Sequence, residues 1–297
     1  SNLGITDLTI AIHKVFNSPR DKIIFDVSHQ CYPHKILTGR AKYFDKLRKL
    51  NGLSGFQKRS ESPHDIYEAG HSSTSISAAL GMALARDKQH KKYHVVAVIG
   101  DGSMGNGLPY EAINHLGSLN TRLIIILNDN EMSISENIGA LHNNLDKIRS
   151  NCKYVNAKKT TKKFLNKIPF IGNKISLGIT NLKSSLKKLY LKDGFLFEEL
   201  GLKYYGPING HDYHELLTYL ELAKKETVPV IIHVITEKGK GYPICENDTL
   251  GLWHGVGPFN KHSGAFLTKK DNLITFSEVV SNHLIELTKR HPEIMVI

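Results

Sequence analysis

The stretch "VVAVIGDGSMGNGLPYEAINHLGSLNTRLIIILNDN", residues 95–130, contains two apolar runs rich in β-branched residues, each of which stops abruptly in small polar residues. The first run ends in Gly-Asp-Gly at 100–102 and the second in Asn-Asp-Asn at 128–130. Nearly continuous apolar runs are typical of strands that are covered on both faces of a parallel sheet. The stretch therefore predicts two buried strands, joined by a helix, that end in similar polar chemistry.

The rest of the chain repeats this alternation. Apolar runs that indicate strands lie at 22–27, 94–99, 122–127 and 228–235. Helical patterns lie at 5–16, 75–86, 108–116 and 212–225. Alternating strands and helices predict an α/β fold: a doubly wound, mostly parallel sheet with helices on both faces. Ligands of such sheets bind beyond the carboxyl ends of the strands, where the two polar clusters are expected.

The formal charge of +11 is concentrated in one part of the chain. Residues 147–192 contain 13 Lys or Arg and no acid, so the rest has 26 basic and 28 acidic residues. We interpret a Lys-rich segment at about 147–193 as an insertion of loops and short helices. Because no RNA-binding or helix-turn-helix pattern accompanies it, the sequence favours a solvated arm over a nucleic-acid surface.

Other classes of protein are disfavoured by composition. No apolar run in the 297 residues approaches the roughly 20 that a membrane-spanning helix needs. The three cysteines, Cys31, Cys152 and Cys245, lie far apart without a CxxC pair, which argues against a disulfide framework or a cysteine zinc site. We expect a protein of a reducing compartment, with no membrane and no nucleic-acid partner.

The last part of the chain has a different pattern. A turn-rich linker, "HGVGPFNKHSGAFLTKKDN" at 254–272, precedes a helical pattern at 275–290 with Ser277 as its expected cap. The following "PEIMVI" predicts the start of a strand. We expect one domain over 1–262, including the insertion, and a linker with the start of a second domain over 263–297.

The polar residues after the two central strands suit a metal and a phosphate. Glycines at 100 and 102 let backbone N–H groups approach a phosphate closely. Asp101 beside a phosphate requires a cation between them, and Mg²⁺ prefers such oxygen ligands. The second strand can supply more oxygens, from the Asn130 side chain and a nearby carbonyl. Either cluster alone is more often a simple turn, so the hypothesis depends on the pair.

The chain resembles a known family over almost its whole length. Gly-Asp-Gly followed by Asn130 matches the thiamine diphosphate motif that transketolase and pyruvate dehydrogenase share. Further segments resemble the 1-deoxy-D-xylulose-5-phosphate synthase family in the same order. They are "DVSHQCYPHKILTGR" at 26–40, "GLSGFQKRSES" at 52–62, "GHSSTSIS" at 70–77, "FEELGLKYYGPINGHD" at 197–212 and "HVITEKGKGY" at 233–242. "HQCYPHKILTGR" distinguishes this family from its relatives.

The resemblance implies a thiamine diphosphate-binding fold and a transferase. Enzymes of the family that the chain resembles condense pyruvate with glyceraldehyde 3-phosphate, with loss of carbon dioxide, to give 1-deoxy-D-xylulose 5-phosphate. It implies Mg²⁺ held by Asp101, Asn130 and the Met132 carbonyl. It further implies cofactor contacts from His29, Gly70, His71, Ser72, Gly102, Ser103, Asn130 and Tyr242. The catalytic candidates are His29, His71 and His254, because an imidazole can exchange protons near neutral pH.

The chain departs from the family pattern in places. Ser28 stands where the family has Gly, Asn209 where it has Asp, and "MGNG" at 104–107 where a Thr-containing loop is usual. "PICENDTLGL" at 243–252 also differs, which loosens the placement of His254. We expect small adjustments of the turns rather than a lost site.

The resemblance also implies that the chain is the N-terminal portion of a longer enzyme. Family members are about twice as long, and the absent part carries the glutamate that activates the cofactor, so we expect this chain to be inactive alone. Alternatives are a transketolase-like subunit with a separate partner chain, or a cofactor-binding module without chemistry. The resemblance further implies a homodimer at the entry to isoprenoid and thiamine synthesis, in the cytoplasm or in a plastid.

Overall fold

The computed structural model describes residues 2–68, 70–130, 195–248, 251–253, 255–267 and 274–296. The chain divides into two compact units, residues 1–251 and 252–297. The Lys-rich segment at 147–193, Met132 and His254 lie outside the described residues. No helix in the described ranges is both long and apolar enough to cross a bilayer.

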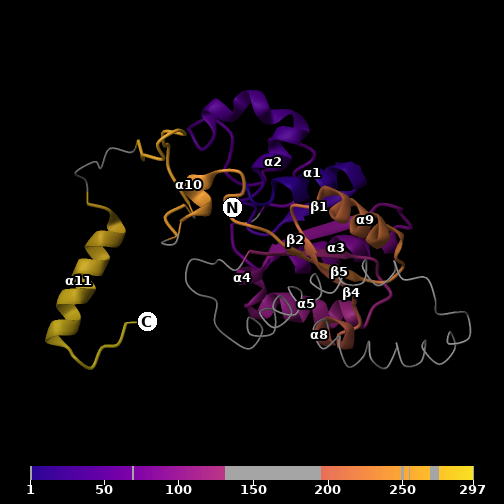
Figure 1. Ribbon diagram of the computed structural model, residues 1–297. Helices are drawn as coiled ribbons and strands as arrows, with labels where there is room; N and C mark the ends of the chain where they lie inside the picture. The colour runs from indigo at the N-terminus through magenta and orange to yellow at the C-terminus, as the bar shows by residue number, and fades with distance from the viewer. Residues whose placement is uncertain are drawn as a thin grey trace, which may run out of the picture. The chain divides into compact units, whose positions relative to one another are not determined.

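The first unit is built on one sheet of five parallel strands (Figure 1). In chain order they are β1 (Lys22–Phe25), β2 (Val95–Gly100), β3 (Ile124–Asp129), β4 (Lys203–Asn209) and β5 (Val230–Ile235). Their order across the sheet is β1-β2-β3-β5-β4. The predicted α/β fold with a parallel sheet is confirmed, and four of these strands lie within two residues of the predicted runs at each end.

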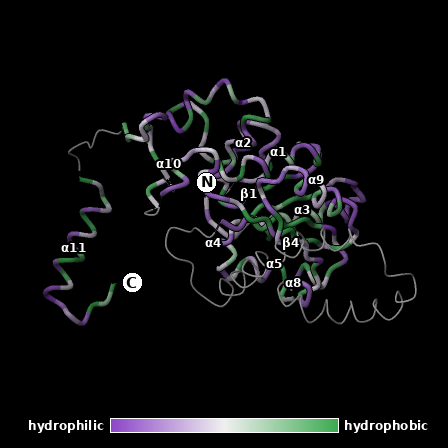
Figure 2. Tube along the Cα trace, viewed as in Figure 1, coloured by the Kyte–Doolittle hydropathy of each residue, from purple (hydrophilic) through white to green (hydrophobic). Residues whose placement is uncertain are grey.

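Helices cover both faces of the sheet. Helices α1 (Thr6–Val15) and α9 (Tyr213–Lys225) pack on one face, and α3 (Ser75–Lys88), α5 (Gly107–Gly117) and α8 (Phe195–Glu199) on the other (Figure 1). Alternate side chains of each strand enter the two apolar clusters; on β2, Val96 and Val98 enter one, and Ala97 and Ile99 the other. Burial on both faces explains the continuous apolar runs, which Figure 2 colours green.

Strand β4 was not predicted. It carries Gly206 and Pro207 in its middle, and its pairing with β5 is irregular between Tyr205 and Ile208. Proline cannot donate to a ladder, so a strand that contains it is tolerated at the edge of a sheet, where β4 lies. Most of its residues are only partly buried, which removes the apolar signal that marks the central strands.

The second unit corrects two expectations. Helix α11 (Phe276–Arg290) forms as predicted, but its cap is Thr275 rather than Ser277. Thr275 and Glu278 form a reciprocal capping box, which places the cap two residues earlier. The expected strand after it is absent from the described residues 292–296, because an extended segment needs a neighbouring strand to satisfy its backbone groups.

Candidate active site

The predicted site residues lie at the carboxyl ends of neighbouring strands. In the register of β2 and β3, Gly100 lies opposite Asn128, so Asp101 and Asn130 follow paired positions. Adjacent strands are about 4.8 Å apart. Asp101 is buried and opens the short helix α4 (Asp101–Met104), and Asn130 is half-buried. The two predicted oxygen ligands therefore extend from adjacent strand ends, whereas Met132 lies outside the described residues.

Two further candidates follow neighbouring strands of the same sheet in the chain. His29 follows β1, and Tyr242 follows β5, which neighbours β3. Tyr242 is half-buried and precedes the short helix α10 (Pro243–Glu246), to which it is the N-cap. The structure thus places candidates after four adjacent strand ends. His254 lies outside the described residues, so the structure says nothing of its place.

The loop that carries Gly70, His71 and Ser72 precedes α3 and is exposed. It is joined to the turn after β2 through the next residue, Ser73. The Ser73 hydroxyl donates to the Ser103 carbonyl at 2.7 Å and accepts from the Asn106 amide at 2.6 Å. Two loops that are 30 residues apart in sequence are therefore fixed to each other.

The loop that carries His29 has an unusual backbone. Val27 and Ser28 both have positive φ, of 57° and 69°. A β-branched residue is rarely found in this left-handed region, so the conformation is strained and is held by its surroundings. The Ser28 hydroxyl accepts from the Gln57 N–H at 2.9 Å, and the His29 carbonyl accepts from the Asn2 side chain at 2.9 Å. Ser28 therefore adopts a left-handed backbone conformation that is held by these contacts.

The structure also shows polar side chains that the sequence analysis missed. Asp129, the last residue of β3, and His233, inside β5, are both buried and are joined at 2.9 Å, and His233 contacts the Tyr204 hydroxyl at 2.9 Å. Asp26, directly after β1, is buried and accepts two backbone N–H groups of the 73–75 segment. Asp26 lies in the apolar run at 22–27 and in the family-like segment at 26–40, but no role was predicted for it from the sequence.

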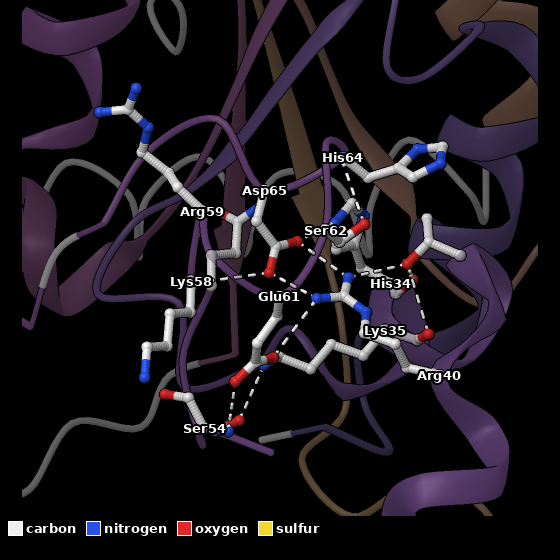
Figure 3. A network of polar contacts seen from close by, with 12 residues as sticks. His34, Lys35, Arg40, Ser54, Lys58, Arg59, Glu61, Ser62, His64 and Asp65 are labelled. Atoms are coloured by element: carbon white, nitrogen blue, oxygen red, sulfur yellow. Dashed lines mark hydrogen bonds and ion pairs between the residues drawn. The ribbon is translucent and has the colours of Figure 1, made fainter. Parts of the chain in front are cut away.

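A second group of titratable side chains lies between 34 and 65, with at most 13% of each side chain exposed, and we call it the ionic network: His34, Lys35, Arg40, Glu61 and Asp65 (Figure 3). Arg40 donates with both terminal nitrogens to Asp65, and His34 Nε2 lies 3.0 Å from Asp65 Oδ1. Lys35 donates to Glu61 at 2.6 Å and to the Ser54 carbonyl at 2.8 Å. These bonds join the segments 34–40 and 54–65.

Burial and pairing shift the titration of this network. Burial alone would raise the pKa of Asp65, but hydrogen bonds from His34 and Arg40 outweigh it, so that pKa lies well below its usual range. Burial lowers the pKa of His34 in spite of Asp65. Burial, with the nearby His34 and His64, lowers the pKa of His13 to about 4. The His34 Nε2–H therefore donates to the Asp65 carboxylate, which leaves Nδ1 to accept from His13 Nε2 at 2.9 Å.

The two cysteines in the described residues are not candidates for the chemistry of the site. Cys31 and Cys245 are buried and free, and Cys152 lies outside the described residues. Burial raises the pKa of the Cys31 thiol to about 12, so this side chain stays protonated near neutral pH.

The strand-end residues fit a diphosphate and a hard cation. A Cβ atom added at Gly70 or Gly100 would meet no atom within 4 Å, so open space lies beside both backbones. The donor set is one carboxylate and one amide, which suits Mg²⁺ shared with phosphate oxygens. The described residues contain no group of three or more His, Cys, Asp or Glu placed to hold a metal alone. A cation here would need ligands from its phosphate partner or from elsewhere.

The fold is shared with enzymes of the transketolase type. The structure of transketolase from Campylobacter jejuni superposes with a TM-score of 0.54 over 81% of this chain and 34% of that chain, at 22% identity. A family model described as 1-deoxy-D-xylulose-5-phosphate synthase matches residues 1–236. The chain belongs to this family.

Curated relatives agree over the whole chain. The 1-deoxy-D-xylulose-5-phosphate synthases of Bacillus cereus (strain AH187) and Bacillus anthracis are each 51% identical over 296 residues, which is 100% of this chain and 47% of each relative. The chain therefore spans about half the length of the curated relatives it matches.

Proposed function

We propose that this chain forms the diphosphate-binding part of a thiamine diphosphate- and Mg²⁺-dependent transferase. The complete enzyme would condense pyruvate with glyceraldehyde 3-phosphate to give 1-deoxy-D-xylulose 5-phosphate and carbon dioxide. The observation that carries the proposal is the register of β2 and β3, which sets Asp101 and Asn130 after paired strand ends. Membership of the synthase family supports the choice of substrates.

Within this proposal the strand ends hold the cofactor. Asp101, Asn130 and the Met132 carbonyl bind Mg²⁺. Contacts to the cofactor come from His29, Gly70, His71, Ser72, Gly102, Ser103, Asn130 and Tyr242. When bound, thiamine diphosphate supplies a carbon nucleophile and an electron sink for the decarboxylation.

Histidines would handle the protons. Carbonyl additions create and consume charge on an alkoxide oxygen, and an imidazole near that oxygen can donate or accept the proton. His71 lies on the exposed loop beside the open space at Gly70, and His29 on the strained loop after β1. We propose these two, with His254, as the proton-handling groups.

Cofactor binding can be tested by calorimetry with thiamine diphosphate and Mg²⁺. We expect Asp101→Asn to abolish Mg²⁺-dependent binding, because the one carboxylate of the donor set is lost. Asp45→Asn, on the exposed side of the short helix η2 (Ala41–Lys46), is the control and should bind as the unchanged protein does. Equal affinity for the cofactor in both variants would contradict the proposed site.

A second experiment concerns activity. Because the chain spans about half the length of its relatives, we propose that it does not turn over substrate alone. Carbon dioxide release from pyruvate should appear only when the remaining half of a synthase is supplied as a second polypeptide. Full turnover by this chain alone would contradict that proposal.

Three further features are also proposals. The enzyme would act as a homodimer, in the cytoplasm or in a plastid. It would supply isoprenoid and thiamine synthesis. Sedimentation of the full-length product of the reading frame tests the homodimer. Complementation of a strain that requires deoxyxylulose tests the supply of isoprenoid and thiamine synthesis.

A further inference from the structure

Asp26 occupies a position that connects the parts of the proposed site. It directly follows β1, and only 1% of its surface is exposed. Its carboxylate accepts from the Ser73 N–H at 2.9 Å and from the Ser75 N–H at 3.1 Å. Ser75 is the first residue of α3, and the N-cap residue Thr74 makes no side-chain cap bond. Asp26 therefore satisfies N–H groups at the start of α3 from outside the helix.

The same residue also belongs to the loop that carries His29. Its main-chain carbonyl accepts from the Gln30 side chain at 3.1 Å. Between Asp26 and His29 lie the two positive-φ residues, Val27 and Ser28. The position of the Asp26 side chain and the path of this strained loop are therefore fixed together.

The connection continues to the turn after β2. Ser73, which donates to Asp26, is itself a non-glycine residue with positive φ, of 74°. Its hydroxyl bonds the Ser103 carbonyl and the Asn106 amide. We call Asp26, Ser73, Ser103 and Asn106 the loop tether, because these four residues join the loops after β1, before α3 and after β2.

We propose that Asp26 is a positioning residue for cofactor binding, which sets the distance between the His29 loop, the Gly70–His71–Ser72 loop and the Gly102–Ser103 turn. The inference rests on the proposed function, since these three loops are the proposed cofactor contacts. Asp26 itself does not touch the cofactor. Its carboxylate holds the N–H groups of Ser73 and Ser75, which follow the proposed cofactor contacts at 70–72 in the chain.

The chain offers a matched control at the other end of the same strand. Asp21 immediately precedes β1, is 6% exposed, and accepts two backbone N–H groups, from Asn17 and His94, both at 2.8 Å. The two carboxylates are thus both buried and have the same kind of partners. They differ in that Asp21 lies at the amino edge of the sheet, away from the strand ends of the site.

The experiment compares Asp26→Asn with Asp21→Asn in the full-length product of the reading frame. An Asn amide presents an NH₂ group to one of the two N–H donors, so both variants should lower the melting temperature. Asp26→Asn should also raise the dissociation constant for thiamine diphosphate, at saturating Mg²⁺, by about 10- to 100-fold. This is the range found when an outer-shell group that orients a metal ligand is removed. Asp21→Asn should leave it within about twofold.

The outcomes separate the two proposals. If the unchanged protein binds thiamine diphosphate and both variants bind it equally well, Asp26 only stabilises the fold and this inference is wrong. If the unchanged protein does not bind it, the proposed function is wrong and the inference falls with it.

A second pair of variants covers the case in which Asp26→Asn does not fold. Ser73→Ala removes the hydroxyl bonds to Ser103 and Asn106 but keeps the N–H that Asp26 accepts. Ser62→Ala removes a buried hydroxyl of the 54–65 segment that accepts from the His64 N–H at 3.2 Å. Weaker cofactor binding in Ser73→Ala alone supports the inference, and equal binding in both overturns it.

Discussion

The loop tether and the ionic network are both polar clusters that join separate segments, but they are made from different bonds. In the ionic network, side-chain charges bind one another: Arg40 and Asp65 are paired at 6% and 0% exposure. In the loop tether, the bonds of Asp26 and the bond from the Ser73 hydroxyl to Ser103 join side chains to backbone groups. Charge pairs fix how two segments pack, whereas bonds to the backbone fix the path of a loop. Charge pairs therefore suit a structural role, and bonds to the backbone suit a binding site whose remaining N–H groups must face a ligand.

The largest expected effect comes from breaking the ionic network. Asp65→Ala leaves Arg40 and His34 buried without their carboxylate, and removal of one partner from such a pair costs about 3–5 kcal/mol. We expect this loss in the free energy of unfolding, measured by urea denaturation. The exposed Asp45→Ala should change it by less than about 0.5 kcal/mol. A loss of under about 1 kcal/mol in Asp65→Ala would show that the network adds little to the fold.

The second prediction uses pH to test His13, which contacts His34 of the ionic network. The pKa of His13 is lowered from 6.5 to about 4, so the unfolded chain takes up a proton in this range that the folded chain does not. Stability is therefore complete above the unfolded pKa and falls as the pH drops from 6.5 towards 4. The shift corresponds to a loss of about 2–3 kcal/mol in the free energy of unfolding between pH 6.5 and 4, after allowance for partial exposure of the ring.

The variant His13→Gln tests this reading, because its amide can still donate to His34 Nδ1 but does not titrate. Unfolding curves at several pH values should show a shallower decline in His13→Gln than in the unchanged protein. His214→Gln, at an exposed position of α9, should decline as steeply as the unchanged protein. Identical slopes for all three proteins would refute the assignment of the loss to His13.

The loop tether should contribute less to stability. Asn106→Ala removes the bond to the Ser73 hydroxyl, which is only partly buried, and a bond of this kind contributes about 1 kcal/mol. We expect a loss of that size in urea denaturation, together with weaker binding of thiamine diphosphate. Asn247→Ala, which removes an exposed side-chain bond to the Pro243 carbonyl, should alter stability slightly and binding not at all. A loss as large as that of Asp65→Ala would remove the contrast between the clusters.

The sequence predicted the central elements because their causes are local. Burial on both faces makes the runs of β2 and β3 continuous, and the polar residues after them follow directly in the chain. It did not predict Asp26 as the partner of Ser73, since 47 residues separate them and either residue alone is an ordinary polar side chain. For the same reason the pairing of Arg40 with Asp65 was not predicted, although Arg40 stands in a segment that resembles the family. Long-range pairing is decided by packing, which a single sequence does not display.

The smallest effect concerns backbone strain outside both clusters. His90 follows the end of α3 with φ of 54°, is exposed, and contacts its surroundings mainly through a backbone bond to Asp87. Glycine adopts this conformation without steric cost, so His90→Gly should raise the free energy of unfolding by about 0.5–1 kcal/mol and leave cofactor affinity unchanged. Val27→Gly relieves similar strain, with φ of 57°, but in the loop that carries His29, so it should weaken cofactor binding. If both glycine variants bind thiamine diphosphate as the unchanged protein does, the strain at Val27 has no part in the site.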